Sequence, residues 1–172
     1  QEGKYFDTYF NYSLNYDMRD QAYQPTSGYQ ASFSQELPVL SNNYEFSNTI
    51  QYIKYKKFPL DIVGKVNFYG NHINALSDGK DVRISKRAFL SQNKLRGFES
   101  GKIGPVDNGD FIGGNYLGAI SFSATLPKLI PSFQNSDISI FLDTANVWGV
   151  DYSSTINDSS KIRSSTGVLL DV

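Results

Sequence analysis

The chain has 172 residues, 16 Lys and Arg against 17 Asp and Glu, a single His, no Cys and a formal net charge of −1. This balance argues against a nucleic-acid partner, because a protein that neutralises phosphates needs a basic surplus. The lack of Cys excludes disulfides, thiolate metal sites and a Cys nucleophile, and one His leaves no poly-histidine site. We therefore expect neither nucleic acid nor a metal or other cofactor.

Aromatic residues are unusually frequent for a chain of this polarity. Twelve Tyr, twelve Phe and one Trp make up 15% of the residues, only 19% are charged, and the mean hydropathy is −0.38. No apolar run approaches the length of about 18 residues that a membrane-spanning helix needs. Aromatic-rich, weakly charged strands are instead typical of transmembrane β-barrels.

The dominant hydrophobic period is two, as residues 5–16 show. The even positions are Phe6, Thr8, Phe10, Tyr12, Leu14 and Tyr16, and the odd positions are Tyr5, Asp7, Tyr9, Asn11, Ser13 and Asn15. Successive side chains of a strand point to opposite faces of its sheet. This segment therefore predicts a strand with lipid on one face and water on the other.

The same alternation recurs in six further segments, at about residues 29–37, 44–58, 62–69, 116–126, 138–143 and 162–172. Strands of roughly 9–13 residues suit a tilted membrane crossing better than an ordinary soluble sheet. Residues 25–28 and 57–59 are compact turn material, and no helical period of adequate length is present. Residues 77–113 form a long, glycine-rich stretch without clear alternation, and such a loop usually has a function.

Seven strands do not close a bacterial barrel, which has an even number of strands and at least eight. An open sheet would leave unpaired backbone groups in lipid, at several kcal/mol each. The chain also begins near mid-strand and ends in mid-strand. We therefore predict an all-β, antiparallel, up-and-down transmembrane β-barrel, present as an open fragment of about seven strands. Residues 1–172 would be part of one barrel domain, with about 77–113 as its long extracellular loop.

Four motifs follow one another in the second half of the chain, and a fifth lies near its start. LRGF occupies 95–98, IGP 103–105, GGN 113–115 and FLDTANVW 141–148, while DMRD at 17–20 precedes PTSG at 25–28. Their order and spacing resemble the outer-membrane protein insertase family of the BamA type. The residues that carry this resemblance in and beside the loop are Arg96, Gly97, Phe98, Ile103, Gly104, Pro105, Gly113, Gly114, Asn115 and Asp143.

The resemblance implies a larger barrel whose extracellular loop folds back into the lumen, with its arginine on inner-wall carboxylates. It also implies POTRA domains and terminal strands that are not in this chain. The implied function is insertion of β-barrel proteins into the outer membrane of a Gram-negative bacterium, without enzyme activity. The implied partners are the lipid bilayer, unfolded outer-membrane proteins as substrates, and assembly-complex lipoproteins bound through the absent domains.

The residue types of the loop motif suit a contact between a loop arginine and a carboxylate of the inner wall, which we call a lock. An arginine inside a lumen needs a carboxylate partner, and its planar fork binds one in a bidentate way that lysine lacks. Gly97 allows a sharp turn or a close approach, and Phe98 can fill a gap beside it. Asp143 shares the polar face of its strand with Ser139, so we expect an Arg96–Asp143 pair.

One position departs from the family pattern. The strand after GGN usually carries an inward Glu as a second partner of the arginine, and Ser123 stands there in this chain. Either the loop is held less firmly, or another acid replaces the Glu. The candidate acids are Glu99, Asp107 and Asp110.

Three other classes remain open at this stage. The first is a dedicated protein translocation or secretion pore of the same superfamily, of the TamA or two-partner-secretion type. The second is a passive porin, although a constriction loop with opposed basic and acidic rows is not evident. The third is a soluble β-sandwich binding module, which the length of the strands argues against.

Overall fold

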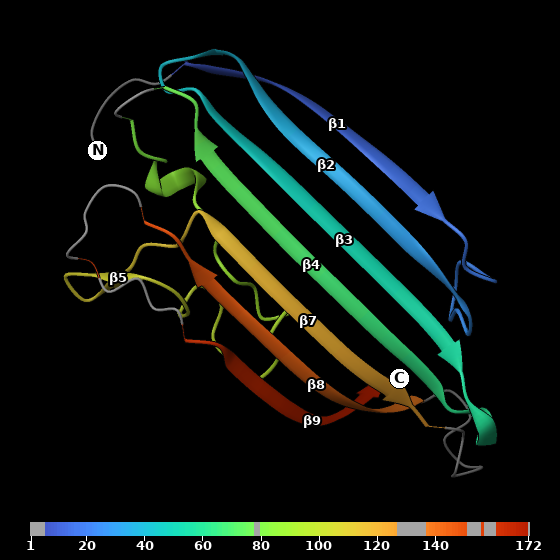
Figure 1. The fold of residues 1–172 in the computed structure, drawn as a ribbon. Helices are drawn as coiled ribbons and strands as arrows, with labels where there is room; N and C mark the ends of the chain where they lie inside the picture. Colours follow the sequence, from blue (N-terminus) through green and yellow to red (C-terminus); the bar gives the residue numbers. More distant parts are fainter. Residues whose placement is uncertain (1–5, 78–79, 127–136, 151–155, 157–160, 172) are drawn as a thin grey trace.

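The computed structural model describes residues 6–77, 80–126, 137–150, 156 and 161–171. A seven-stranded antiparallel sheet dominates it, in the order β1-β2-β3-β4-β7-β8-β9 (Figure 1). The strands are β1 Asp7–Asp17, β2 Gly28–Ser41, β3 Glu45–Lys57, β4 Val63–Ala75, β7 Tyr116–Thr125, β8 Asp137–Trp148 and β9 Arg163–Asp171. The predicted all-β antiparallel fold, open and with seven strands, is confirmed.

The strand ends differ most from the sequence prediction in β4. The alternation of apolar and polar residues stops at Tyr69, but pairing with β3 continues until Ala75 lies opposite Glu45. Backbone hydrogen bonds, which do not depend on side-chain polarity, carry the strand across Gly70 and Asn71. β4 then pairs directly with β7, and the long loop between them leaves the plane of the sheet.

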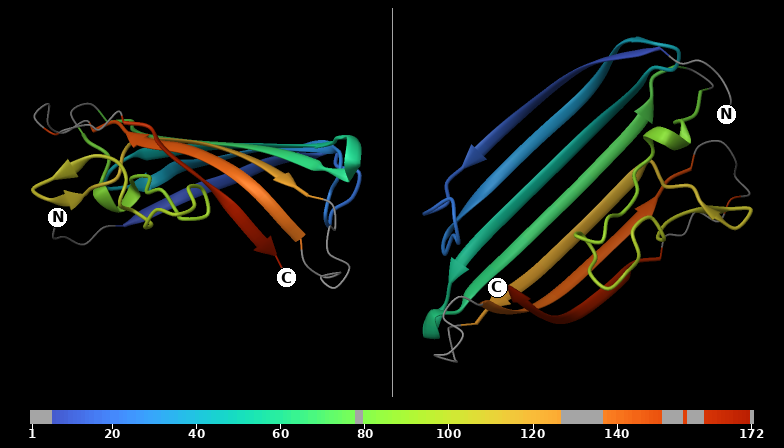
Figure 2. Two further views of the ribbon diagram at one scale, coloured as in Figure 1. Left: turned by 90° about the horizontal axis from the view of Figure 1, so that it is seen from below. Right: turned by 180° about the vertical axis from the view of Figure 1, so that it is seen from behind.

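The two faces of the sheet differ as the alternation predicts. Most of the exposed large apolar side chains of the strands share one face, and among them are Phe10, Leu14, Ile50, Tyr52, Phe68, Phe122, Ile140, Leu142 and Val168. The other face carries polar and acidic residues such as Glu36, Glu45 and Asp143. The sheet is bent, and the loop lies on its polar, concave side (Figure 2). Within the described ranges, no helix is long and apolar enough to cross a membrane.

Aromatic rings form rows across the strands on the apolar face. At the end of the sheet that carries the long loop, His72 stacks on Tyr116 with ring centroids 4.8 Å apart, and Tyr116 stacks on Trp148 at 5.7 Å. At the opposite end, Tyr29 lies 5.9 Å from Tyr16. Two such levels are typical of the aromatic girdles that mark the two interfaces of a membrane barrel.

The turn between β1 and β2 is built around one carboxylate. Asp20 accepts hydrogen bonds from the Thr26 hydroxyl at 2.6 Å and from the backbone N–H groups of Thr26 and Ser27. These donors hold the pKa of Asp20 at about 2. Gly28, at φ +91°, closes the turn, where an added Cβ would lie 2.1 Å from the Met18 carbonyl oxygen. The DMRD and PTSG segments are therefore two halves of one turn.

The hydrophobic core lies between the loop and the concave face. Figure 2 (right) shows the loop crossing the sheet over β4, β7 and β8. The buried apolar cluster contains Ile73, Val82, Ala88, Leu90, Leu95, Ile103, Leu117, Ala119, Ala145 and Val147. Leu95 and Val147 are fully buried. The loop is therefore a packed part of the fold, since it supplies half of this cluster.

The loop contains short elements that the sequence analysis did not predict. They are η2, a 3₁₀ turn at Ile84–Lys86, and a small hairpin of β5 (Val106–Asp107) and β6 (Asp110–Phe111). Asn108 and Gly109 turn this hairpin with φ values of +48° and +91°. Positive φ at both central residues is the geometry that asparagine and glycine favour. A further 3₁₀ turn, η1 at Pro59–Asp61, joins β3 to β4.

We predict that Leu95→Ala lowers the free energy of unfolding by about 2–5 kcal/mol, because it opens a cavity at a fully buried site. The matched control is Leu76→Ala, since Leu76 belongs to the same loop but is 56% exposed. Urea unfolding of the natural protein in detergent micelles measures both variants. Equal, small losses for the two would contradict a loop packed on the sheet.

Candidate functional site

Arg96 and Asp143 form a bidentate pair on the concave face. Arg96 Nε donates to Asp143 Oδ2 at 2.7 Å, and Nη2 donates to Oδ1 at 2.7 Å. The backbone N–H of Arg96 also donates to Oδ2, at 3.1 Å. The Asp143 side chain is 1% exposed and that of Arg96 27%. One buried carboxylate therefore holds both the backbone and the side chain of the loop arginine.

The guanidinium has two further partners, and neither is a second acid. Arg96 Nη2 donates to Ser121 Oγ at 3.0 Å, and Arg96 Cζ lies 3.7 Å from the centroid of the Phe141 ring, within cation–π range. Ser121 pairs with Asp143 across β7 and β8, and Ser123 pairs with Phe141. In this chain the Arg96 guanidinium therefore contacts a hydroxyl and an aromatic ring in addition to Asp143, in place of the second carboxylate of the family pattern.

The acids that the sequence analysis held open do not take the place of the missing Glu. Among the described residues, the hydrogen-bond acceptors of the Arg96 guanidinium are Asp143 and Ser121. Glu99 and Asp110 are exposed, and Asp107 lies opposite Asp110 in the small hairpin. Of the two alternatives left open by the sequence, replacement of the Glu by one of these three acids is therefore not what the structure has, because they lie on the return arm of the loop and do not accept from the guanidinium.

The residues next to Arg96 shape the tip of the loop. Gly97 has φ +83°, and an added Cβ would meet nothing within 4 Å. Glycine is therefore required for backbone conformation and not for space. Phe98 packs against the apolar cluster. The backbone N–H of Gly101 donates to the Leu90 carbonyl at 2.8 Å and closes the tip.

The IGP motif lays the return arm of the loop on β8. Ile103 is 6% exposed and Pro105 is fully buried. Gly104 has φ +121°, and an added Cβ would lie 3.0 Å from the Cβ of Val147. Here glycine serves both conformation and close approach.

The GGN motif joins the end of the loop to two other segments. Gly114 and Ala88 exchange backbone hydrogen bonds at 2.8 and 3.0 Å, and the Asn115 N–H donates to the Gly149 carbonyl at 2.9 Å. An added Cβ on Gly114 would lie 2.4 Å from the Trp148 carbonyl oxygen, and one on Gly113 would lie 2.8 Å from that of Ala88. GGN therefore fixes the loop to the end of β8.

A second ion pair lies at the start of the loop, and the sequence analysis missed it. Arg83 donates to Glu45 Oε2 from Nε at 3.0 Å and from Nη2 at 2.9 Å, and Nη1 donates to Asp7 Oδ2 at 2.8 Å. Asp7 is one of the polar odd positions of the first strand, and Glu45 is the first residue of β3. No motif marks Arg83, so its partner was not predictable from local sequence.

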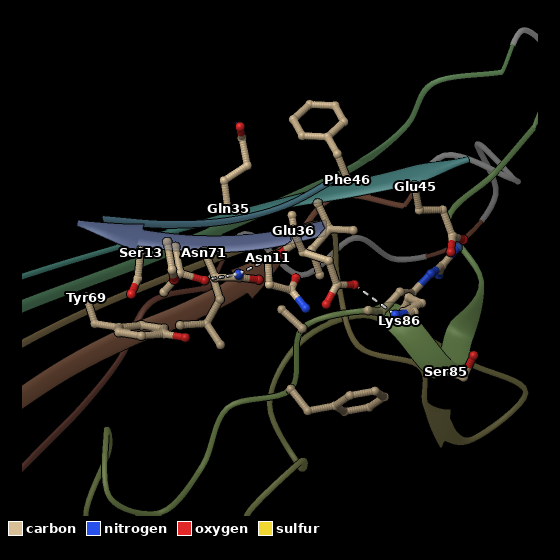
Figure 3. A pocket seen from close by; sticks show the side chains of 18 of the residues that line it. Asn11, Ser13, Gln35, Glu36, Glu45, Phe46, Tyr69, Asn71, Ser85 and Lys86 are labelled. Atoms are coloured by element: carbon tan, nitrogen blue, oxygen red, sulfur yellow. Dashed lines mark hydrogen bonds and ion pairs between the residues drawn. The ribbon is translucent and has the colours of Figure 1, made fainter. Parts of the chain in front are cut away.

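Lys86 extends this contact along the same arm. Its Nζ donates to Glu36 Oε1 at 2.8 Å and lies 3.9 Å from the centroid of the Tyr9 ring. Burial opposes the charged form of Lys86, but the hydrogen bond to Glu36, the negative charge of Glu36 and the interaction with Tyr9 together outweigh it, so the pKa of Lys86 is raised. Figure 3 shows Lys86 directed at Glu36, while Gln35 and Phe46 point to the opposite face of the sheet.

Two hollows flank the loop on the concave face. One of about 600 Å³ lies between the first arm and β1–β4, with Asn11, Ser34, Ser47 and Asn71 on its wall. The other, of about 910 Å³, lies beyond the Arg96 pair and extends to the turn between β1 and β2. The described residues contain no group of three or more side chains that could hold a metal ion. The concave face is thus polar and hollow, with the loop across it.

These features define a class of protein: the wall of a transmembrane β-barrel with a long loop folded onto its inner surface. The strands are long, their convex face is apolar with two aromatic levels, and their concave face is polar. The sequence matches the Omp85 superfamily domain over residues 1–172. The chain therefore belongs to the Omp85 superfamily.

Two comparisons place the chain within this superfamily. It is 25% identical over 167 residues to the outer membrane protein assembly factor BamA of Neorickettsia risticii (strain Illinois), covering 91% of this chain and 22% of that protein. The crystal structure of BamA from Haemophilus ducreyi lacking POTRA domains 1–3 superimposes with a TM-score of 0.78 at 26% identity, covering 94% of this chain and 35% of that one. The chain thus spans about a fifth of its curated relative.

We predict that Asp143→Asn weakens the attachment of the loop by about 2–3 kcal/mol. This is somewhat less than for a fully buried pair, because the Arg96 side chain keeps 27% exposure. Ser121→Ala should cost about 0.5–1.5 kcal/mol, since it removes one hydrogen bond. Urea unfolding of the natural protein in detergent micelles measures both. A larger loss for Ser121→Ala than for Asp143→Asn would refute the central role of the carboxylate.

We further predict that Ser123→Glu strengthens the attachment by about 0.5–1 kcal/mol. Arg96 Nη1 makes no hydrogen bond among the described residues. Ser123 pairs with Phe141, the residue whose ring the guanidinium contacts. A carboxylate there would give Nη1 an acceptor. Ser123→Gln is the control for side-chain size, and equal stabilities of the two variants would contradict the prediction.

Proposed function

We propose that this chain is part of a membrane insertase that assembles β-barrel proteins and inserts them into the outer membrane of a Gram-negative bacterium. The observation that carries the proposal is the loop arginine, held on the concave face by a buried carboxylate of β8. It occurs in an Omp85 superfamily chain whose curated relative is called an assembly factor. Because the chain spans 22% of that relative, the activity of the whole protein is proposed here.

The proposed action is physical and needs neither catalytic residues nor a cofactor. A substrate strand pairs with an exposed edge of the insertase barrel, so that backbone hydrogen bonds guide it. Folding gains free energy when the strand buries its apolar face in lipid and satisfies its polar backbone. This chain contributes the wall and its loop, which together keep the barrel in a defined shape while a seam elsewhere opens.

The proposed partners follow from the two faces of the sheet. The convex face, with exposed residues such as Phe122 and Val168, contacts the hydrocarbon of the bilayer. Unfolded outer-membrane proteins are the substrates. Assembly lipoproteins would bind through parts of the protein outside this chain.

A secretion pore of the same superfamily is the second candidate. The observation in its favour is Ser123, which replaces the acid expected in an insertase of the BamA type. The two functions differ in what leaves the protein. An insertase yields a folded barrel in the membrane, and a pore yields a polypeptide on the far side.

The test uses the natural protein in proteoliposomes with an unfolded β-barrel substrate. We predict that Arg96→Ala slows substrate folding roughly tenfold, which corresponds to about 1.4 kcal/mol, because the loop loses its hold on β8. Folding is followed by protection of the substrate from protease. The control is Lys80→Ala, since Lys80 is an exposed cation of the same loop.

Two outcomes would count against the insertase. If Arg96→Ala assembles the substrate at the wild-type rate, as the control Lys80→Ala is expected to do, the Arg96 lock has no part in assembly. Alternatively, the wild-type protein itself could fail to accelerate folding and instead pass an unfolded polypeptide across the bilayer. That second result would select the secretion pore.

A further inference from the structure

We propose that Arg83 is a second lock, independent of Arg96, which holds the first arm of the loop on β1 and β3. It is a positioning residue for the assembly reaction, and this part of the inference rests on the proposed function. Arg83 forms ion pairs with Glu45 and Asp7, and its Nη2 also donates to the Tyr9 hydroxyl at 3.1 Å. The argument rests on the form of the contact, its burial and its place in the sheet.

The two locks share one design. At each, a single carboxylate of a strand accepts from both the backbone N–H and the guanidinium of a loop arginine. Asp143 does this for Arg96, and Glu45 does it for Arg83, with the Arg83 N–H on Oε1 and the guanidinium on Oε2. Such an arrangement recognises the backbone position as well as the charge, so it fixes where the loop runs.

The Arg83 lock is more deeply buried than the Arg96 lock. The Arg83 side chain is 8% exposed and that of Glu45 is 2% exposed, against 27% for Arg96. Burial opposes the charge of Arg83, but hydrogen bonds to Glu45 and Asp7 outweigh it, so its pKa is raised. A buried charge that loses its partner is strongly destabilising. The arm therefore has one favourable position, with Arg83 on Glu45.

Neighbouring contacts strengthen this position. Asn43 Nδ2 donates to Glu45 Oε1 and to the carbonyl of Asp81, both at 3.0 Å. The amide therefore orients the Glu45 carboxylate and keeps the loop backbone at Asp81 beside it. Lys86 adds the pair with Glu36 on β2. The arm is thus bound to three strands, β1, β2 and β3.

The two locks lie on opposite flanks of the sheet. The Arg83 lock uses β1 and β3, whereas the Arg96 lock uses β7 and β8, with β4 and the apolar cluster between them. Among the described residues, the hydrogen bonds and ion pairs of the two locks have no side chain in common. The loop therefore braces the concave face from one flank to the other, and the tip can detach while the first arm stays bound.

The test measures each arm separately by pulsed electron paramagnetic resonance on the natural protein in lipid vesicles. One spin-label pair is at Ser85 and Tyr44, which report the first arm, and the other is at Asn93 and Tyr23, which report the tip; all four residues are exposed. We expect Arg83→Met to abolish the narrow distance peak of the first pair only. Arg96→Met should abolish that of the second pair only.

A clear pattern of results would overturn the inference. If Arg83→Met leaves the first distance distribution unchanged, Arg83 is no lock. If Arg96→Met broadens both distributions, the loop has a single lock. Where Arg83→Met fails to insert, as judged by heat-modifiable mobility on gels, Glu45→Gln serves instead, because it removes the charge and keeps the shape.

The assembly assay adds a readout that a purely structural residue would not move. With every variant folded to the same extent, we expect Arg83→Met to slow substrate folding roughly tenfold and Arg83→Lys to restore part of the rate. Lys80→Met is the control. If the wild-type protein assembles no substrate, the proposed function fails but the distance measurements still decide the lock. If the wild-type protein assembles substrate and Arg83→Met does so at the same rate, the positioning role fails.

Discussion

A carboxylate buried on the concave face is the constraint on which the rest of this structure depends. Asp143 is withdrawn from water on a strand whose other face is apolar, and it is stable there only because Arg96 reaches it with a backbone N–H and a bidentate fork. An unpaired charge at that place would cost several kcal/mol. The ion pair therefore requires the loop to fold onto the sheet, and the folded loop in turn supplies half of the apolar cluster.

The same physical logic explains why the core lies where it does. A barrel wall buries its outer face in lipid and wets its inner face, so the sheet alone has no dry interior. Leu95 and Ile103 of the loop and Leu117 and Val147 of the strands create one. The glycines of IGP and GGN allow this packing, since side chains at Gly104 and Gly114 would meet β8 at 3.0 Å and 2.4 Å.

Much of the architecture was predictable because its cause is local. Alternation along residues 5–16 and the later segments reflects two solvents on two faces, and each strand records this in its own residues. The pairing of Arg96 with Asp143 was also accessible, since the motif and the strand phase both pointed to it. The extent of β4 was not, because backbone pairing continued where side-chain alternation had stopped.

The sequence by itself determined the class of fold, the faces of the strands and the membership of a family, because periodicity and motif order are properties of the chain. Only the tertiary structure decided which side chains complete the two locks. Ser121 and Phe141 replace the missing acid at Arg96, and Arg83 meets Glu45 and Asp7 from 38 and 76 residues away. Such partners are chosen by the curvature of the sheet and the path of the loop, which bring distant residues together without leaving a local pattern in the sequence.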